Sequence, residues 1–362
     1  MVALLKVMAG PRAYAHIRSH GLQAEHIRTI VSASGAAKTL TTVGLEKMIF
    51  GTWLNNSDHQ IDLLGTSAGA FKMAAAARKD PAHWLDVFAK TYSTKKYALK
   101  LRGQDRRNVI TDATREMIAA LLADGGAAEI LDNPRFRVHF GTVRCRGQLA
   151  SEDKWRQRMA VAKASLRSSI SSHSLRGLAE RVIFSDPRSQ TDLRAIDRYP
   201  SFLNDLTTEN LATALMASGS IPVMMHGVEI ETEQGKHIYR DGGMIDYHPV
   251  PSQIWPLQDG LVLYPHFYDY LKWRWFDKFY PWRKVSPSML DNVVLLAPSF
   301  AYVSALPGKR IPSRQDFWRY AYNEDKRCTS WQTTVSRSEE LGQSFIELVQ
   351  SGRIADDIQL LK

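Results

Sequence analysis

One serine lies in a setting that could make it a nucleophile. Gly65-Thr66-Ser67-Ala68-Gly69 matches the pattern G-x-S-x-G, in which a sharp turn from a strand into a helix projects the serine hydroxyl from the edge of a sheet. The apolar segment 61–64 before it and the alanine-rich segment 68–77 after it are typical of such a strand and helix. The alternative is a tight turn whose serine only caps the helix, and the pentapeptide alone does not decide between them.

A possible base lies 174 positions further along the chain. Asp241, in Tyr239-Arg240-Asp241-Gly242-Gly243, follows a predicted strand, and the two glycines would let the backbone pack closely around an open carboxylate. Such a carboxylate could accept the serine proton during attack on an ester carbonyl. Taken alone, an Asp-Gly pair more often forms an ordinary turn.

The two motifs together resemble the patatin-like phospholipase family, whose members use a Ser–Asp dyad without histidine. Ala217-Ser218-Gly219-Ser220-Ile221-Pro222 is similar to the Ala-Ser-x-x-x-Pro segment of that family, and Asp246 and Pro249 resemble the residues that follow its aspartate. The resemblance covers residues 27–255 in the order of the family. It implies that Ser67 is the nucleophile and Asp241 the base.

The resemblance is weakest in the first loop, where the family carries G-G-G-x-[KR]-G. The matching residues here are 34–39, Ser-Gly-Ala-Ala-Lys-Thr, so only one of the three leading glycines is present. The resemblance implies that backbone N–H groups of Gly35 or Ala36, with that of Ala68, form the oxyanion hole. Ala36 fits that role at a negative φ, whereas a positive φ would be costly for a residue with a Cβ. Lys38 either adds positive potential near the site or is simply solvated.

The elements around these motifs predict an α/β protein. Short β-branched or apolar segments at 29–31, 61–64, 138–143, 261–263 and 293–296 are typical of buried strands, 227–239 of a hairpin, and 38–53, 68–77, 208–217 and 337–349 of helices. Asp80-Pro81 is typical of a helix start. With the resemblance, this order predicts a patatin-like three-layer αβα fold with a mainly parallel central sheet.

We expect three parts along the chain. Residues 1–26 form an N-terminal extension, 27–300 the catalytic domain, and 301–362 a helical C-terminal extension. Residues 151–205 are polar and rich in Arg and Ser, and we interpret them as an insertion or cap with little core.

Composition limits the possible partners and compartment. The net charge of +10 attracts polyanions such as nucleic acid or an anionic membrane. Cys145 and Cys328 are expected to be reduced thiols, and no cluster has zinc spacing, so no metal or cofactor is expected. The apolar run at the N-terminus is interrupted by Lys6, and no uninterrupted apolar stretch of membrane-spanning length exists. A cytoplasmic location follows as the expectation.

Tyr264–Lys284 alternates aromatic with cationic side chains. Trp and Tyr favour the membrane interface, where Lys and Arg reach toward lipid head groups. We therefore expect this segment to contact a membrane peripherally or to frame the entrance for an acyl chain. A surface for a protein partner is the main alternative, nucleic acid is unlikely, and the oligomeric state stays open.

The predicted function is hydrolysis of carboxylic ester bonds in phospholipids or related lipids through an acyl-enzyme on Ser67. A dry pocket would raise the pKa of Asp241 from about 3.9 and make it a stronger base; candidate lining residues are Leu64, Met73, Met216, Met224 and Met244. A thioesterase or acyltransferase would use the same dyad. Two alternatives remain open: a lipid- or partner-binding protein without turnover, and a Ser-His-Asp triad using His248 or His266.

Overall fold

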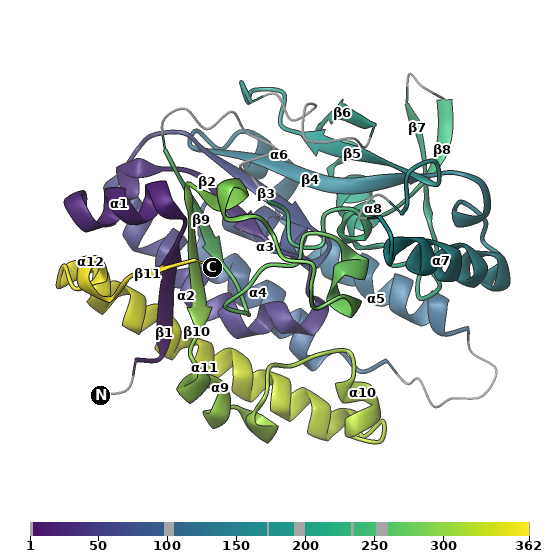
Figure 1. The fold of residues 1–362 in the computed structure, drawn as a ribbon. Coiled ribbons are helices and arrows are strands. Elements are labelled where there is room, and N and C mark those ends of the chain that lie inside the picture. Colours follow the sequence, from purple (N-terminus) through teal and green to yellow (C-terminus); the bar gives the residue numbers. More distant parts are fainter. Residues whose placement is uncertain are drawn as a thin grey trace.

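The computed structural model describes residues 3–97, 105–171, 174–191, 200–232, 235–250 and 260–361. Within them the chain forms an 11-stranded sheet with helices packed against it (Figure 1). The strands are β1 Leu5–Ala9, β2 Ile27–Ser32, β3 Ile61–Thr66, β4 Phe136–Cys145, β5 Ala179–Ser185, β6 Ser201–Asp205, β7 Val228–Thr232, β8 Gly235–Asp241, β9 Leu261–Pro265, β10 Val293–Pro298 and β11 Gln359–Leu360. The helices are α1 Pro11–His20, α2 Val43–Gly51, α3 Ala68–Ala76, α4 Pro81–Thr94, α5 Arg106–Leu121, α6 Gly126–Leu131, α7 Lys154–Ser168, α8 Leu211–Gly219, α9 Phe300–Ala305, α10 Asp316–Arg319, α11 Glu324–Gln350 and α12 Ile354–Asp357.

The centre of the sheet is parallel. Strands β10, β9, β2, β3 and β4 lie side by side in that order and run in one direction. β1 at one side, and β5 and β8 at the other, pair antiparallel with this group. The predicted α/β class with a mainly parallel central sheet is confirmed.

One edge of β4 is shared by two strands that meet head-on. β3 pairs with β4 up to Gly141, opposite Thr66, and β8 pairs with the next residue, Thr142, opposite Asp241. β3 runs parallel to β4 and β8 antiparallel to it, so the carboxyl ends of β3 and β8 point at each other. This register brings the residue after β3 next to the last residue of β8.

Both faces of the central strands are buried. In β10, Val294 and Leu296 join the large apolar cluster formed with the helices, whereas Val293 and Leu295 join a second cluster on the opposite face. The second cluster includes Phe267 and other residues of the long segment between β9 and β10. Successive side chains of a strand point to opposite faces of the sheet. A strand that is buried on both faces therefore has a continuous apolar sequence.

Most predicted elements are confirmed, including the cap of α4, where the Asp80 side chain accepts a hydrogen bond from the His83 N–H at 3.0 Å. The hairpin of β7 and β8 is also present, although its turn residues 233–234 lie outside the described residues.

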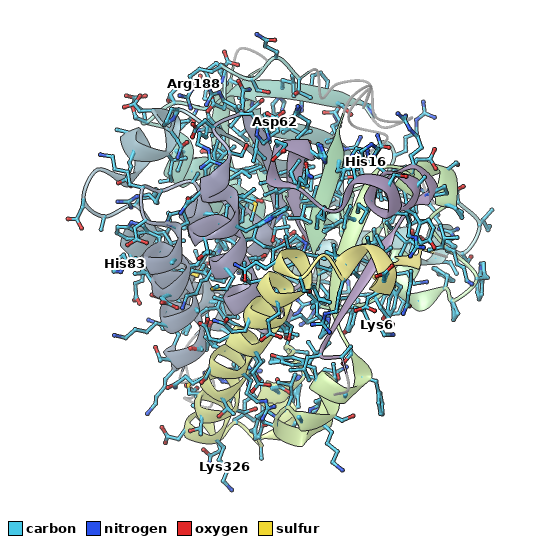
Figure 2. The ribbon with its side chains drawn as sticks, turned by 90° about the vertical axis from the view of Figure 1, so that its left-hand side faces the viewer. Lys6, His16, Asp62, His83, Arg188 and Lys326 are labelled. Atoms are coloured by element: carbon cyan, nitrogen blue, oxygen red, sulfur yellow. The ribbon has the colours of Figure 1, made fainter. Side chains whose placement is uncertain are left out.

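Three helices begin or end at residues other than those expected. The segment 38–53 begins as a 3-10 helix, η2 Ala36–Thr42, before α2; α8 begins later than expected, and the C-terminal helix is the longer α11. Figure 2 shows α11 running across one side of the molecule, with Lys326 near its N-terminal end.

The segment 151–205 contains more core than expected. β5 is buried along its whole length and lies between β4 and β6. It escaped prediction because two of its residues are charged, and both charges are neutralised inside the fold. Glu180 pairs with Arg144 at 2.6 Å, and Arg181 pairs with Asp246 at 2.6 Å. A strand with buried ion pairs does not show the usual apolar pattern.

The cysteines and the helix lengths can be compared directly with the sequence expectations. Cys145 and Cys328 are both free and buried. None of the helices in the described ranges combines the length and apolar character needed to cross a bilayer.

Candidate active site

Ser67 lies at the sharp turn between β3 and α3. Its backbone has φ 55° and ψ −127°, a strained conformation for a residue with a side chain. The small neighbours are required by close packing: a Cβ on Gly69 would lie 2.1 Å from the Ser32 carbonyl oxygen, and one on Gly65 would lie 2.6 Å from the Ala70 nitrogen. The G-x-S-x-G pattern therefore marks a strained serine turn here, as the sequence predicted.

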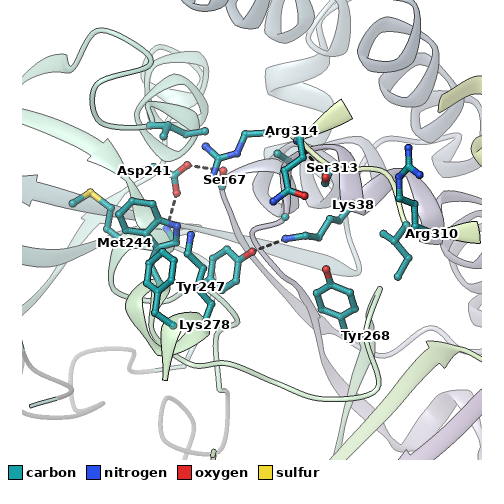
Figure 3. A pocket seen from close by; sticks show the side chains of 18 of the residues that line it. Lys38, Ser67, Asp241, Met244, Tyr247, Tyr268, Lys278, Arg310, Ser313 and Arg314 are labelled. Atoms are coloured by element: carbon teal, nitrogen blue, oxygen red, sulfur yellow. Dashed lines mark hydrogen bonds between the residues drawn. The ribbon is translucent and has the colours of Figure 1, made fainter. Parts of the chain in front are cut away.

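The structure brings Ser67 and Asp241 together. The Ser67 hydroxyl donates to Asp241 Oδ2 at 2.6 Å, and the Gly243 N–H donates to Oδ1 at 2.7 Å. Figure 3 shows the contact between Ser67 and Asp241 at the cavity wall. The head-on meeting of β3 and β8 on β4 fixes this pair, and the arrangement allows Asp241 to accept the serine proton directly.

Burial makes Asp241 a stronger base than a solvated aspartate. Desolvation raises the pKa of Asp241 to about 6, against the opposing effects of the Ser67 and Gly243 hydrogen bonds and of the positive charge of Arg314. The carboxylate keeps both hydrogen bonds but has no cation in direct contact among the described residues. It can therefore be ionised near neutral pH and still bind a proton readily.

Ser218 and Asp246, two further residues of the family-like motifs, form contacts that position the backbone around Ser67 and Asp241. The Ser67 N–H donates to Ser218 Oγ at 3.0 Å, and the Ser218 hydroxyl donates to the Gly141 carbonyl at 2.8 Å. Ser218 thus ties the serine turn to β4. Asp246 accepts two hydrogen bonds from Arg181, at 2.6 and 2.8 Å, which anchors the loop after Asp241.

The three residues expected at the oxyanion hole lie around Ser67. Gly35 and Ala36 line a large cavity with Ser67, and Ala68 lines a smaller pocket with Ala36 and Ser67. Ala36 and Ala68 are the first residues of η2 and α3, where backbone N–H groups have no preceding carbonyl to bond. Ala36 has φ 50°, so the negative φ at which it fits the oxyanion role is not found, and the loop holds an alanine in the costly conformation that favours glycine.

Two cavities meet at Ser67. The larger, of about 680 Å³, also contains Asp241 and is lined by residues of the segments 268–279 and 303–319. The smaller, of about 90 Å³, lies between α3, α4, α5, α8 and α11 and is mainly apolar, with Phe71, Tyr92 and Trp331 among its lining residues. Ser67 is therefore open on one side to a wide cavity and on the other to a narrow apolar pocket.

Only some of the residues expected around the site line these cavities. Met244 lines the large cavity and Met224 the small pocket. Leu64 and Met73 are buried in the core, and Met216 packs against it. The ordinary core role that the sequence left open applies to these three residues.

Histidine takes no part in the site that the described residues form. The pKa of His248 lies well below its ordinary value because of burial, and burial lowers the pKa of His266 to about 3. His248 Nδ1 accepts a hydrogen bond from the Lys272 N–H at 3.0 Å, and His266 Nδ1 is bonded to the Tyr268 backbone. Within the described ranges neither imidazole contacts Ser67 or Asp241, so the geometry favours a dyad. The same ranges contain no group of His, Cys, Asp or Glu side chains placed to hold a metal ion.

The large cavity is strongly cationic, a feature that sequence reasoning largely missed. Asp241 is the only carboxylate among its described lining residues, whereas six are cationic: Lys38, Lys278, Lys309, Arg310, Arg314 and Arg319. Arg310 and Arg319 share the buried Asp316, at 3.7 and 3.2 Å. Four of the six come from residues 309–319, where no motif marks them.

Lys38 and Lys278 lie among aromatic rings at the cavity wall. Lys38 donates to the Tyr247 hydroxyl at 2.9 Å, and the Lys278 ammonium lies 4.2 Å from the Trp275 ring centroid. Burial, followed by the charges of Arg314 and Lys38, lowers the pKa of Lys278 to about 7. Lys278 is nevertheless an exposed residue that faces the open cavity, with the rings of Trp275 and Phe279 beside its ammonium group. An anion in the cavity would raise this pKa again.

The aromatic and cationic segment Tyr264–Lys284 divides between core and cavity. Phe267 and Leu271 are buried in the second apolar cluster. Tyr268, Trp275, Lys278 and Phe279 line the large cavity. The segment therefore frames the cavity beside Ser67.

Two sequence comparisons test how the chain relates to known proteins. The sequence profile described as patatin-like phospholipase matches residues 63–252, which is more than half of the chain. Comparison with the sequences of curated proteins finds no match.

Two solved structures resemble the chain in part. A human GIVD cytosolic phospholipase A2 has a TM-score of 0.45 and 11% identity, over 95% of this chain and 62% of the human one. VipD from Legionella pneumophila has a TM-score of 0.35 and 12% identity, over 100% of this chain and 76% of VipD. The chain thus spans 62% of the length of the human enzyme. Because the profile covers more than half of the sequence and includes both Ser67 and Asp241, the chain belongs to the patatin-like phospholipase family.

Proposed function

We propose that the protein is a lipid acyl hydrolase that cleaves carboxylic ester bonds of phospholipids or related lipids through the Ser67–Asp241 dyad. Membership of the family supports lipid hydrolysis in general. The observation that carries the finer proposal is the 2.6 Å hydrogen bond from the Ser67 hydroxyl to Asp241, at the point where two cavities meet.

The reaction would proceed in two halves. Ser67 Oγ attacks the ester carbonyl carbon while its proton passes to Asp241 Oδ2, and N–H groups of Gly35 or Ala36 with that of Ala68 hold the oxyanion. The tetrahedral intermediate breaks the ester bond, and the leaving alcohol takes the proton from Asp241. Water then gives a proton to Asp241 and attacks the acyl carbon. The bond from that carbon to Ser67 Oγ breaks, Asp241 returns the proton to Ser67 Oγ, and the fatty acid is released.

The two cavities suggest how the ester would be oriented. The narrow apolar pocket suits the acyl chain, because burial of methylene groups there is favourable. The wide cationic cavity suits the head-group side of a phospholipid, since its phosphate would lie near Arg314 and Lys278. A thioesterase or acyltransferase would share the first half-reaction and differ only in the leaving group or the acceptor.

Membrane contact through Tyr264–Lys284 belongs to the same proposal. Its aromatic residues frame the cavity that contains Ser67, so a bilayer in contact with this segment would place lipid near the nucleophile. The division into residues 1–26, 27–300 and 301–362 is likewise proposed, with the cationic residues 309–319 of the last part completing the cavity.

The direct test measures fatty acid release from phosphatidylcholine, phosphatidylserine and a short-chain ester by wild type and Ser67→Ala. A matched control is Ser32→Ala. Ser32 is a buried serine close to the Ser67 turn, and its hydroxyl forms no hydrogen bond with any described residue. We expect activity in wild type and in Ser32→Ala, and none in Ser67→Ala. Equal release by wild type and Ser67→Ala would contradict the proposal.

A second candidate is a family member that binds lipid or a partner without turnover. The positive φ of Ala36 favours it, because strain in this loop could displace the oxyanion donors. Ala36→Gly removes the Cβ at this conformation. A folded wild-type protein that hydrolyses no ester, together with an active Ala36→Gly variant, would support this candidate.

A further inference from the structure

Helix α7 presents an apolar stripe to solvent. Trp155, Met159 and Leu166 on the helix, and Ile170 in the turn that follows it, are exposed to 67, 37, 75 and 90%. At 3.6 residues per turn their directions fall within about 60° of one another. Four large apolar side chains in one line on the surface are unusual for a solvated helix.

The opposite face of α7 holds the helix to the protein. Its buried residues are Gln157, Ala160, Ala164 and Ser168. The Gln157 side chain accepts a hydrogen bond from the Val223 N–H at 2.7 Å. Polar and small residues thus face the protein while large apolar ones face solvent, the reverse of the usual surface helix.

Cations lie on both sides of the stripe. Between 154 and 170 the chain has five basic residues and no acidic one: Lys154, Arg156, Arg158, Lys163 and Arg167. Lys154 pairs with Asp105 at 2.9 Å. The other four form no ion pair with any residue that the structure describes. By helical geometry Arg158 lies on one side of the stripe, and Arg156, Lys163 and Arg167 on the other.

The helix is connected to the wall of the large cavity. The Tyr280 hydroxyl donates to the Ser165 carbonyl on α7 at 2.8 Å. The residues just before Tyr280, Lys278 and Phe279, line the cavity that contains Ser67. Figure 1 shows α7 along the outside of the molecule. A surface bound by α7 would therefore lie beside the cavity wall.

From these observations we infer that α7 is an interfacial helix that binds the surface of an anionic lipid bilayer, with its stripe among the acyl chains and its cations at the phosphate groups. An exposed apolar stripe between flanking cations matches the layered polarity of a bilayer surface. The unpaired cations match its negative charge. The inference does not depend on catalysis, because a protein without its nucleophile would bind in the same way.

The test uses the full chain with Ser67→Ala, which prevents any change in the lipid, and vesicles of phosphatidylcholine with or without phosphatidylserine. Two variants probe the surface: Leu166→Gln with Ile170→Gln, and Arg158→Gln with Lys163→Gln. The matched controls are Leu360→Gln, an exposed apolar residue on β11, and Lys90→Gln with Lys326→Gln on α4 and α11.

We expect sedimentation with phosphatidylserine vesicles and much less with pure phosphatidylcholine. Loss of two interfacial cations should lower partitioning by roughly 25-fold, and loss of the two apolar side chains by at least about 10-fold. Both controls should bind as the parent does. No vesicle binding by the parent, equal binding to both vesicle types, or full binding by the α7 variants would overturn the inference.

A second measurement locates the contact. An environment-sensitive dye on Ile170→Cys should brighten when phosphatidylserine vesicles are added, and the same dye on Leu360→Cys should not. An unchanged signal at position 170 in vesicle-bound protein would overturn the assignment to α7. Hydrolysis of a short-chain ester by the wild type, measured separately, tests the proposed function. Its outcome does not change the conclusion about vesicle binding by α7.

Discussion

Two buried carboxylates in this molecule have opposite surroundings. Glu46 on α2 is sealed in the core and accepts a hydrogen bond from the Lys72 ammonium of α3 at 2.6 Å. Asp241 is also buried, but it lies on a cavity, and among the described residues its carboxylate is bonded only to a hydroxyl and a backbone N–H. Burial raises the pKa of Glu46 to about 7 and that of Asp241 to about 6.

The difference between them lies in what a change of protonation could act on, because the pKa of each is raised. Glu46 has a cation in contact and borders neither of the cavities at Ser67, so a change in its protonation has no substrate to act on. No cation of the described ranges contacts Asp241, and its bonded hydroxyl belongs to a residue at the cavity surface. Burial with a lysine partner stabilises a core contact, whereas burial beside a serine and a cavity prepares a base.

The largest expected effect is on activity. Asp241→Asn keeps a side chain of the same shape but cannot accept the serine proton, so ester hydrolysis should fall by about 10²- to 10⁴-fold. Glu46→Gln should retain most of the activity of its folded fraction. Steady-state kcat/KM with a short-chain ester checks both variants, and a similar loss in both would erase the distinction between the two carboxylates.

The next effect is on stability. Lys72→Met leaves Glu46 buried without its cation and should lower the free energy of unfolding by about 3–5 kcal/mol at pH 8. The loss should be smaller at pH 5, where a proton neutralises Glu46. Urea unfolding at the two pH values measures it, with Glu46→Leu plus Lys72→Met as the control that should recover most of the stability. A fully stable single variant would show that the pair is dispensable.

A substitution of Asp241 should change the free energy of unfolding in the opposite direction to Lys72→Met. The pKa of Asp241 is raised in the folded protein, so its ionisation reduces stability as the pH rises from about 4 to 6, and the reduction stays constant above that range. Asp241→Asn should therefore raise the free energy of unfolding by up to about 3 kcal/mol at pH 8, and by little at pH 4. If this variant were destabilised at pH 8, the carboxylate would be a structural group like Glu46.

The smallest effect concerns the pH dependence of catalysis. The rate of hydrolysis should rise with pH and level off with a midpoint of about 6, because only ionised Asp241 accepts the serine proton. Arg314 favours the ionised form, so Arg314→Gln should move the midpoint upward by less than about one pH unit. Arg115→Gln on the exposed face of α5 serves as the control. A midpoint unaffected by Arg314→Gln would place this residue outside the electrostatics of the site.

The sequence predicted the proximity of Ser67 and Asp241 better than it predicted the residues around them, and the reason is local. The turn at Ser67 and the strand end at Asp241 are each encoded by adjacent small residues, and the resemblance related the two. The cationic cavity wall depends on Arg310 and Arg314, which come from a loop more than 60 positions beyond Asp241 and have no motif. Long-range packing placed them, and a single sequence does not report it.

The polar segment 151–205 shows a second limit of sequence patterns. β5 was hidden by Glu180 and Arg181, whose charges are paired in the fold. α7 was hidden because its apolar side chains face solvent rather than the core. Pattern analysis assumes that apolar residues are buried and charges exposed, and both elements reverse this assumption.

We propose that Ser67 is a nucleophile activated by Asp241. A fluorophosphonate ester forms a stable bond with an activated serine, so intact-mass measurement followed by peptide mapping shows whether Ser67 reacts. We predict one adduct per chain, on Ser67, formed rapidly by wild type and Ser32→Ala and far more slowly by Asp241→Asn. An adduct on another serine, or folded protein that forms none, would contradict it.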